Sequence, residues 1–574
     1  MANLEIAKVF YEIADILELQ DVEWKPRAYR RAAQAIETLD KDVSEIYHEK
    51  GIKGLMEIPG VGEALAKKII EYLETKKIKE YEKLKASLPR GLYELMDIMG
   101  LGPRKIKIFY KKLHIKSLKD LENALKKHKI EKLEGFGEKS EENIKKAIEL
   151  HKRSKGRFLL GTALPIAENM VNELKKLKDV NKINVGGSLR RMQETIGDID
   201  ILVTSKNAKK VMDVFTSLED VKRVLAKGPT KSMVLLKQGI QADVRVLDDK
   251  SYAAALQYFT GNKEHNIVLR GIALKKGLKL SEYGLFNKKN NKMLTIKSEE
   301  ELYNKLGLQY IEPELRQNFG EVEAAKLNKL PRLIPYNSIK GDLHVHSNYS
   351  DGRSSIIEMV QGARKLNYKY VAITDHSKAR AIAHGLNEDR VLKQIKEIQK
   401  LRKKFKDIYI FTGTEVDIKS NGELDLGEDV LKKLDIVIGS IHSGFKQNKE
   451  EMTKRLIKAF DTGLIKIFGH PTTRIINFRP EIQFDFNKIF GYCSENNIAL
   501  EIDSFPNRLD LKDLYVREAI KNNVKIIIDS DSHSIDHFKL IKYGIAQARR
   551  GWATKHDIIN TYDLKDFKKF FNIK

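Results

Sequence analysis

The chain contains 574 residues, a length that predicts about three to four domains with ample hydrophobic core. Its 105 lysines and arginines exceed its 80 acidic residues, and a formal charge of +25 favours nucleic acid as a partner over a general lysine-rich surface bias. The single cysteine, Cys493, excludes a disulfide framework and indicates a reducing compartment. The sequence has neither a signal-peptide pattern nor a run of ~18 apolar residues, so we expect a cytoplasmic, nucleoid-associated protein without a membrane span.

Three similar glycine turns divide the first 150 residues. Each consists of an apolar residue, a G-x-G turn and a lysine-rich amphipathic helix, and the glycine pairs are Gly60 and Gly62, Gly100 and Gly102, and Gly135 and Gly137. This is the helix-hairpin-helix pattern, in which backbone N–H groups approach a DNA phosphate without obstruction by side chains. A plain connection between helices would explain one such turn, but three in series predict DNA binding that does not depend on base sequence.

Three aspartates follow in two alternating strands. Asp198 and Asp200 lie two residues apart in an apolar segment, so they point to one face of the strand. An exposed acidic strand end is the alternative, but Asp243 adds a third carboxylate in a second alternating strand. Mg²⁺ prefers one or two carboxylates together with phosphate oxygens, and three carboxylates can hold two such ions. The pattern predicts a catalytic pair of Mg²⁺ ions.

A Gly-Ser turn and a basic pair precede these aspartates. Gly187 and Ser188 offer backbone N–H groups and a hydroxyl to a phosphate, while Arg190 and Arg191 offer charged donors. A phosphate-binding turn next to paired metal-binding carboxylates is the chemistry of nucleotidyl transfer.

The sequence changes character after two prolines near residue 335, which mark a linker. Helical patterns then alternate with seven apolar strands, near residues 342–346, 370–375, 408–415, 435–441, 465–469, 498–502 and 524–528. This alternation predicts a parallel sheet closed as a (βα)₇ barrel.

Metal-ligand residue types stand at the ends of these strands, where such barrels gather their catalytic groups. They are His344, His346, Asp351, His376, Glu415, His442, His470, Asp531 and His533. A single histidine at a strand end is usually structural, but so many imidazoles and carboxylates cannot pack together without cations to bridge them. Metal ions in such a site activate water and neutralise phosphate, which predicts hydrolysis of phosphate esters.

The Gly-Ser turn, the three aspartates and a segment near residues 258–270 resemble motifs of family X DNA polymerases, the group typified by DNA polymerase beta. The similar palm residues are Gly187, Ser188, Arg191, Gly197, Asp198, Asp200 and Asp243. The similar thumb residues are Tyr258, Phe259, Thr260, Gly261, Asn266 and Arg270. The resemblance implies that Ser188 and Arg191 bind a triphosphate, that Tyr258, Phe259 and Gly261 line the sugar pocket, and that Asn266 contacts the base. Arg270 is expected at the DNA, and Ala163 departs from the animal enzymes, which carry an arginine near the triphosphate.

The first 85 residues resemble the small lyase domain of DNA polymerase beta. Such a lyase uses an amine to form a Schiff base with an abasic sugar, and Lys68 stands where the family carries that lysine. Lys25, Tyr29 and Arg30 stand where the family has its 5′-phosphate pocket. Lys67 could be the exposed amine instead, and plain DNA binding by this domain is the alternative.

The nine strand-end residues match the pattern of the PHP (polymerase and histidinol phosphatase) domain. The match implies a cluster of up to three Zn²⁺, Mn²⁺ or Fe²⁺ ions, and the Irving–Williams order allows all three. Fusion to a polymerase favours a 3′–5′ exonuclease. The alternatives are a phosphatase, an endonuclease at abasic sites, or a non-enzymatic scaffold for DNA ends.

We therefore predict a bacterial or archaeal family X polymerase with a PHP domain, which fills short gaps in base-excision repair. Its expected partners are gapped or nicked duplex DNA and deoxynucleoside triphosphates, and it is expected to be a monomer. The expected parts are a lyase-like helical domain with the first helix-hairpin-helix (1–85), a helical DNA-binding domain with two more (86–152), an α+β nucleotidyltransferase palm (153–248), a small α/β thumb (249–315), a linker (316–338) and the PHP barrel (339–574).

Overall fold

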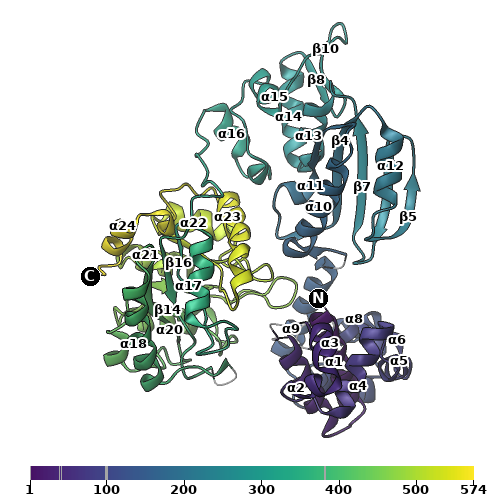
Figure 1. Ribbon diagram of the computed structural model, residues 1–574. Coiled ribbons are helices and arrows are strands. Elements are labelled where there is room, and N and C mark those ends of the chain that lie inside the picture. Colours follow the sequence, from purple (N-terminus) through teal and green to yellow (C-terminus); the bar gives the residue numbers. More distant parts are fainter. Residues whose placement is uncertain are drawn as a thin grey trace. The chain divides into compact units, whose positions relative to one another are not determined.

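The computed structural model describes residues 2–573 except 38, 40–41, 97, 99–100, 155 and 381–382 (Figure 1). The chain forms two compact units, residues 1–155 with 477–479, and residues 156–476 with 480–574. The predicted multidomain fold class is confirmed: a helical region is followed by a palm, a thumb and a barrel. None of the described helices is long and apolar enough to cross a membrane.

The described residues of the first unit up to residue 154 form helices and loops. The helices are α1 (Ala2–Leu19), α2 (Lys25–Glu37), α3 (Val43–Met56), α4 (Glu63–Thr75), α5 (Lys79–Ala86), α6 (Arg90–Met96), α7 (Pro103–Leu113), α8 (Leu118–Lys126) and α9 (Glu138–Ser154). The side chains of Asp42 and Ser117 accept hydrogen bonds from the first turns of α3 and α8, which fixes where these helices begin. Phe10 packs edge to face on Tyr29 in the core of the first four helices.

The three predicted glycine turns lie at the starts of helices. Gly62 precedes α4, Gly102 precedes α7, and Gly135 and Gly137 precede α9. A Cβ atom added at any of these four glycines would meet no atom within 4 Å. Open space around this backbone is what the approach of a phosphate requires. Gly100 lies outside the described residues, and Gly60 packs against the Arg31 side chain.

The palm contains a five-stranded sheet in the order β2-β4-β7-β6-β5. Its elements are β1 (Phe158–Leu159), α10 (Leu160–Lys175), β2 (Val180–Val185), α11 (Gly187–Arg190), β3 (Thr195–Ile196), β4 (Asp198–Ser205), α12 (Ala208–Thr216), β5 (Val221–Lys227), β6 (Lys231–Leu236) and β7 (Gln241–Leu247). Ile199, Ile201 and Val244 are fully buried with residues of α10 and α12. This apolar face fixes the register that leaves the aspartates of β4 on the opposite face. Ala163 is part of the same core.

The thumb combines helices with a small antiparallel sheet. Its elements are α13 (Tyr252–Thr260), α14 (Lys263–Lys275), β8 (Leu278–Ser281), β9 (Gly284–Asn287), β10 (Met293–Leu294), α15 (Glu299–Lys305), η1 (Pro313–Leu315) and α16 (Glu321–Lys326). Helix α16 lies in the predicted linker, and its Val322 and Ala325 pack into the thumb core with Leu302.

The C-terminal part is a nearly closed parallel barrel of seven strands. The strands follow chain order, β11 (Gly341–Asp342), β12 (Tyr370–Ile373), β13 (Tyr409–Asp417), β14 (Ile436–Ser440), β15 (Ile467–Phe468), β16 (Ala499–Asp503) and β17 (Ile526–Asp529). A parallel bridge between Val345 and Ser532 joins the first strand's continuation to the last. Strand β11 is shorter than predicted because the N–H groups of Leu343 and Val345 donate to the Asp529 and Thr374 side chains instead of a neighbouring strand.

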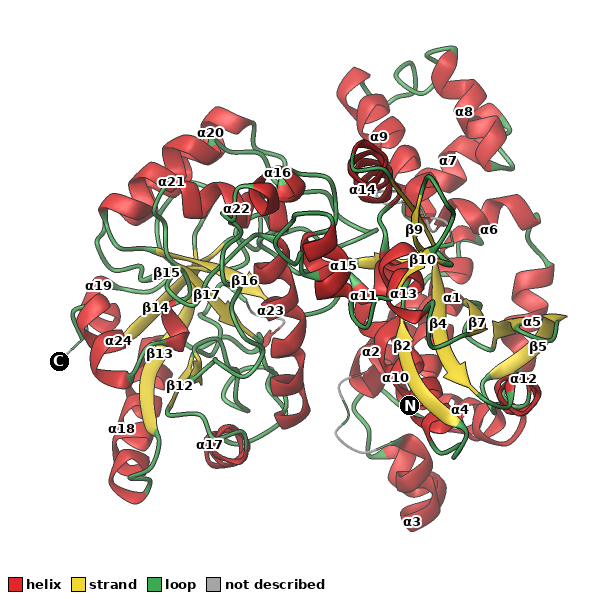
Figure 2. Cartoon of the chain, turned by 90° about the horizontal axis from the view of Figure 1, so that it is seen from above, coloured by secondary structure: helices red, strands yellow, loops and turns green. Residues whose placement is uncertain are grey.

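Helices cover the outside of these strands (Figure 2). They are α17 (Ile356–Lys365), α18 (Glu388–Lys404), α19 (Glu428–Leu431), α20 (Lys449–Phe460), α21 (Phe486–Glu495), α22 (Asp513–Lys521), η3 (Ile535–Leu540), α23 (Ile541–Arg550), η4 (Ile559–Thr561) and α24 (Leu564–Phe570). Cys493 is buried in this layer as a free thiol.

Candidate active sites in the palm and the barrel

The three predicted palm carboxylates lie on neighbouring strands. Asp200 on β4 pairs in register with Asp243 on β7, and Asp198 is two residues earlier on the same face. Burial, together with the charges of Asp198 and Asp243, raises the pKa of Asp200 to about 6. The Lys231 ammonium lies 3.1 Å from Asp243 Oδ2, and Gln241 Nε2 donates to Asp243 Oδ1 at 3.0 Å. Carboxylates crowded in this way are a set that divalent cations neutralise.

The predicted phosphate turn lies directly against this strand. The N–H of Gly186 donates to the Asp200 carbonyl at 2.8 Å. Gly187 has φ +59°, and a Cβ there would lie 2.8 Å from Asp200 Oδ2, so only glycine fits. The turn therefore presents Ser188 beside the carboxylates. Gly197, the residue before Asp198, lies near the Arg157 guanidinium.

The two arginines after the turn have different surroundings. Arg190 is paired with Glu299 at 2.5 Å and donates to Thr260 Oγ1 at 2.6 Å, so it ties the palm to the thumb. Arg191 donates to the Thr260 carbonyl, and its buried Nε has no hydrogen-bond partner. Burial and the nearby positive charge of Arg316 lower the pKa of Arg191 to about 10. Such a buried cation favours an anionic ligand, which agrees with the predicted role of Arg191 at a triphosphate.

Arg191 and the predicted thumb residues line one pocket of about 310 Å³. Its lining residues are Arg191, Tyr258, Phe259, Gly261, Asn262, Lys263, Asn266 and Arg270. Asn266 Nδ2 donates to the Tyr258 carbonyl at 2.7 Å, while its Oδ1 accepts from Gln257 Nε2 at 2.8 Å. The Asn266 amide is thus held in one orientation at the pocket wall.

The barrel brings the predicted metal-ligand residues together. Eight of the nine fall into three overlapping groups with ligand atoms within 4.8 Å of one another: His346, Asp351, His376 and His533; His344, His346 and Asp531; and His376, Glu415 and His442. The ninth, His470, places Nε2 3.0 Å from Glu415 Oε1. The Glu415 carboxylate therefore lies at the centre of the set.

The electrostatics of this cluster fit metal ions. Buried atoms without a hydrogen-bond partner include Nε2 of His344, both ring nitrogens of His346, Oε2 of Glu415 and Oδ1 of Asp531. Burial and the neighbouring His533 and His376 lower the pKa of His346 to about 4, so its imidazole is neutral and able to bind a cation. Orphaned polar atoms in a dry interior are costly, and cations among them would satisfy them.

A layer of acidic residues behind the cluster was not predicted as functional. Glu501 Oε1 lies 2.6 Å from His344 Nδ1, and Glu501 Oε2 accepts from the His470 N–H at 2.5 Å. A carboxylate in that position orients an imidazole and fixes which nitrogen faces a metal. Arg508 Nε lies 3.3 Å from Asp503 Oδ2; the Asp503 side chain is buried and that of Arg508 is partly exposed. The sequence signal that could have indicated a role for Glu501 is the presence of acidic residues inside the otherwise apolar strand β16.

The predicted lyase residues gather around an acidic side chain. Lys68 Nζ lies 2.7 Å from Glu80 Oε2, and the Tyr29 hydroxyl donates to the same oxygen at 3.2 Å. The charges of Lys68 and Lys25 help to lower the pKa of Glu80 against its burial, which works to raise it. The predicted nucleophile is thus ion-paired, and Glu80 is a residue that the sequence motifs did not indicate.

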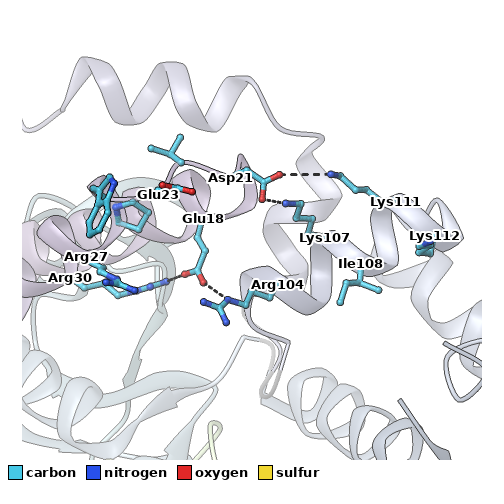
Figure 3. Close-up of a pocket in the computed structure, with 13 residues that line it drawn as sticks. Glu18, Asp21, Glu23, Arg27, Arg30, Arg104, Lys107, Ile108, Lys111 and Lys112 are labelled. Atoms are coloured by element: carbon cyan, nitrogen blue, oxygen red, sulfur yellow. Dashed lines mark hydrogen bonds and ion pairs between the residues drawn. The ribbon is translucent and has the colours of Figure 1, made fainter. Parts of the chain in front are cut away.

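Arg30 lies apart from that group, in a second pocket of about 650 Å³ between α1, α2 and α7 (Figure 3). Glu18 joins Arg30 and Arg104 across it, at 2.5 and 3.1 Å. Trp24 is 75% exposed at its rim, with the Arg27 guanidinium over its ring. The pocket combines exposed aromatic surface and cations, a combination typical of single-stranded nucleic-acid sites.

Comparison with known families supports the same division of the chain. Residues 163–257 match the family model for the DNA polymerase beta palm, and residues 255–317 that for the DNA polymerase beta thumb. Residues 342–504 match the PHP domain. Residues 1–78 match a helix-hairpin-helix domain, and residues 92–149 a SAM-like helix-hairpin-helix tandem.

Similar proteins span the whole chain or its parts. The DNA polymerase/3'-5' exonuclease PolX of Bacillus subtilis (strain 168) is 36% identical over 573 residues, 99% of each chain. DNA polymerase lambda of Rattus norvegicus is 25% identical over 349 residues, 54% of this chain and 56% of that protein. A protein of Thermoanaerobacter sp. (strain X514) named "Probable phosphatase" is 28% identical over 240 residues, 41% of this chain and 94% of its own.

Fold, sites and similarities together define a polymerase-beta-like palm and thumb joined to a PHP barrel. The chain belongs to the family X DNA polymerases that carry helix-hairpin-helix motifs and a C-terminal PHP domain.

Proposed function

We propose that the palm and thumb extend DNA primers across short gaps and that the barrel removes nucleotides from 3′ ends. The register of Asp200 with Asp243, next to the phosphate turn and the 310 Å³ pocket, is the observation that carries the first activity. Such work takes place on gapped or nicked duplex DNA with deoxynucleoside triphosphates as substrates. We further propose a monomer associated with the nucleoid.

In the palm, Ser188 and Arg191 bind the triphosphate while the pocket wall around Asn266 receives the sugar and base. Asp198, Asp200 and Asp243 would hold two Mg²⁺ ions. Ions bound there would lower the pKa of the attacking hydroxyl and neutralise the leaving group. Because the pKa of Asp200 is raised, this carboxylate has to lose its proton before it can bind a cation.

In the barrel, the cluster around Glu415 holds up to three ions of Zn²⁺, Mn²⁺ or Fe²⁺. Bound ions would activate water and neutralise the scissile phosphate. Glu501 orients His344, and the partly exposed Arg508 is available beside Asp503 for a phosphate. These residues support hydrolysis of phosphodiesters and of phosphomonoesters alike, so the similarity to a protein named as a probable phosphatase keeps phosphatase activity as the second candidate.

The helical unit binds the DNA. The open turns at Gly62, Gly102, Gly135 and Gly137 contact phosphates through their backbone, and Arg270 of the thumb contributes a further DNA contact. Gly60 and Gly100 belong to the same turns and are proposed with them. Lys68 is the proposed Schiff-base lysine, with Lys25, Tyr29 and Arg30 as contacts to a 5′ phosphate.

A 5′-labelled primer in a gapped duplex, incubated with and without nucleotides, tests this function. Extension with nucleotides and stepwise 3′ shortening without them are the expected products. Internal cutting at an abasic site, or release of terminal phosphate alone, would replace the exonuclease with an endonuclease or a phosphatase. No change in the primer under either condition would leave a DNA-end scaffold.

A further inference from the structure

A palm carboxylate whose side chain is only 16% exposed lies among side chains of the barrel. Glu194 follows the phosphate turn in sequence and is bound by Arg474 at 2.6 and 3.2 Å. Gln547 Nε2 donates to Glu194 Oε1 at 2.9 Å, and the Arg550 guanidinium lies 3.5 Å from the same oxygen. Burial works to raise the pKa of Glu194, but Arg474 and Arg550 hold it at about 2. The carboxylate is therefore charged at every physiological pH.

The barrel side of this junction is held by further contacts within the barrel. Arg474 also donates to the Leu509 carbonyl, and Arg550 is paired with Asp513 at 2.6 Å. Leu509 and Tyr543 of the barrel are buried in the same apolar cluster as the palm sheet. Only 7% of the Arg474 side chain and 3% of the Arg550 side chain are exposed, so little water reaches these guanidinium groups in place of Glu194.

The palm side leads directly to the nucleotide pocket. Arg550 Nη1 donates to the Met192 carbonyl at 2.8 Å, and Met192 has a left-handed φ of +50°. This conformation is uncommon for a residue other than glycine and persists where neighbouring groups hold it. The N–H of Gln193 donates to the Ser188 carbonyl at 3.0 Å. Side chains of the barrel thus bind Met192 and Glu194, which lie between Arg191 and Asp198 in the chain.

We propose that Glu194 is a positioning residue through which the barrel sets the phosphate turn of the palm, so that tight nucleotide binding requires the barrel's Arg474 and Arg550. The inference rests on the proposed nucleotide binding by Ser188 and Arg191. The Glu194 carboxylate binds Arg474, Gln547 and Arg550 of the barrel, so it would act on the nucleotide site through the segment 191–194. Loss of its charge leaves the Arg474 guanidinium with the more distant Glu481 carboxylate, at 3.9 Å, as its remaining ion-pair partner, and we expect the segment to shift in response.

Steady-state gap filling by the full-length protein tests the proposal. Glu194→Gln and Arg474→Gln should each raise the KM for the incoming nucleotide about tenfold while kcat changes less than about twofold. Glu194→Asp, which keeps the charge, should fall between them and the unmodified protein. Glu168→Gln is the matched control, because Glu168 makes a palm–barrel pair with Lys542 at 3.4 Å that is largely exposed. It should leave both constants unchanged.

An unchanged KM in Glu194→Gln overturns the proposal, even where kcat falls, because a merely structural role lowers the amount of active protein and not its affinity. If Glu194→Gln lost its fold, judged by circular dichroism, Arg474→Gln decides the question by the same criterion. A rise in KM in Glu168→Gln as large as in Glu194→Gln would also contradict it, since any contact between palm and barrel would then suffice. Absence of gap filling by the unmodified protein would refute the proposed function itself, and the inference with it.

Discussion

Asp200 and Asp243 occupy paired positions on the parallel strands β4 and β7, although 43 residues separate them in the chain. Like charges held this close in a partly buried site repel one another, which contributes to the pKa of about 6 at Asp200. The palm therefore keeps a strained set of carboxylates that a cation relieves.

Removal of one palm carboxylate should stop synthesis without disturbing the barrel. Asp243→Asn and Asp198→Asn each delete a cation ligand, so primer extension should fall by about 10³-fold or more. DNA binding and metal-dependent 3′ shortening should persist, because they depend on other parts of the chain. Extension, gel-shift and exonuclease assays on the same preparations measure all three. Survival of extension in both variants would contradict the two-metal palm.

The Mg²⁺ requirement of extension should depend on pH. Because the folded pKa of Asp200 is raised to about 6, a proton occupies this ligand at lower pH and leaves it at higher pH. Half-maximal extension should therefore need roughly tenfold more Mg²⁺ for each pH unit below 6, and a constant amount above about pH 7. Titrations of Mg²⁺ at pH 5, 6, 7 and 8 check this. Equal requirements at pH 5 and pH 8 would rule out Asp200 as the titrating ligand.

Borohydride trapping tests the lysine of the helical unit. Reduction with a 5′-deoxyribose-phosphate substrate should yield a covalent adduct that Lys68→Ala removes. Lys67→Ala is the control, because Lys67 is 66% exposed and pairs with Glu63. Glu80→Gln should increase the yield severalfold, since it releases the Lys68 amine from its ion pair. Equal trapping by Lys68→Ala would move the nucleophile elsewhere, and no trapping at all would leave a binding domain.

The sequence predicts the parts of this molecule whose signals are local. The alternation around Asp198 and Asp200 is a property of one strand, and each proposed barrel ligand stands at a recognisable strand end. Hydrophobic period and turn residues suffice for such features. The order of the domains follows from the same motifs.

The features that the sequence did not predict are contacts between residues distant in the chain. Glu80 on α5 pairs with Lys68 on α4 only in the folded chain, and Glu501 reaches His344 across 157 residues. Glu194 meets Arg474 across 280 residues. A buried ion pair has no periodic signature, since either partner alone reads as a surface charge. The short β11 has a similar cause, because side chains satisfy its backbone groups.

Separate active sites in palm and barrel are the central claim, and one pair of time courses tests it most directly. His344→Ala with His346→Ala removes two imidazoles from the barrel cluster, so 3′ shortening of a labelled primer without nucleotides should fall by about 10³-fold or more. With nucleotides, gap filling should stay within about tenfold of the unmodified protein. Bound metal, counted by mass spectrometry, should drop, and added Mn²⁺ should not restore shortening. Undiminished shortening with unchanged metal content, or a parallel loss of gap filling, would contradict the claim.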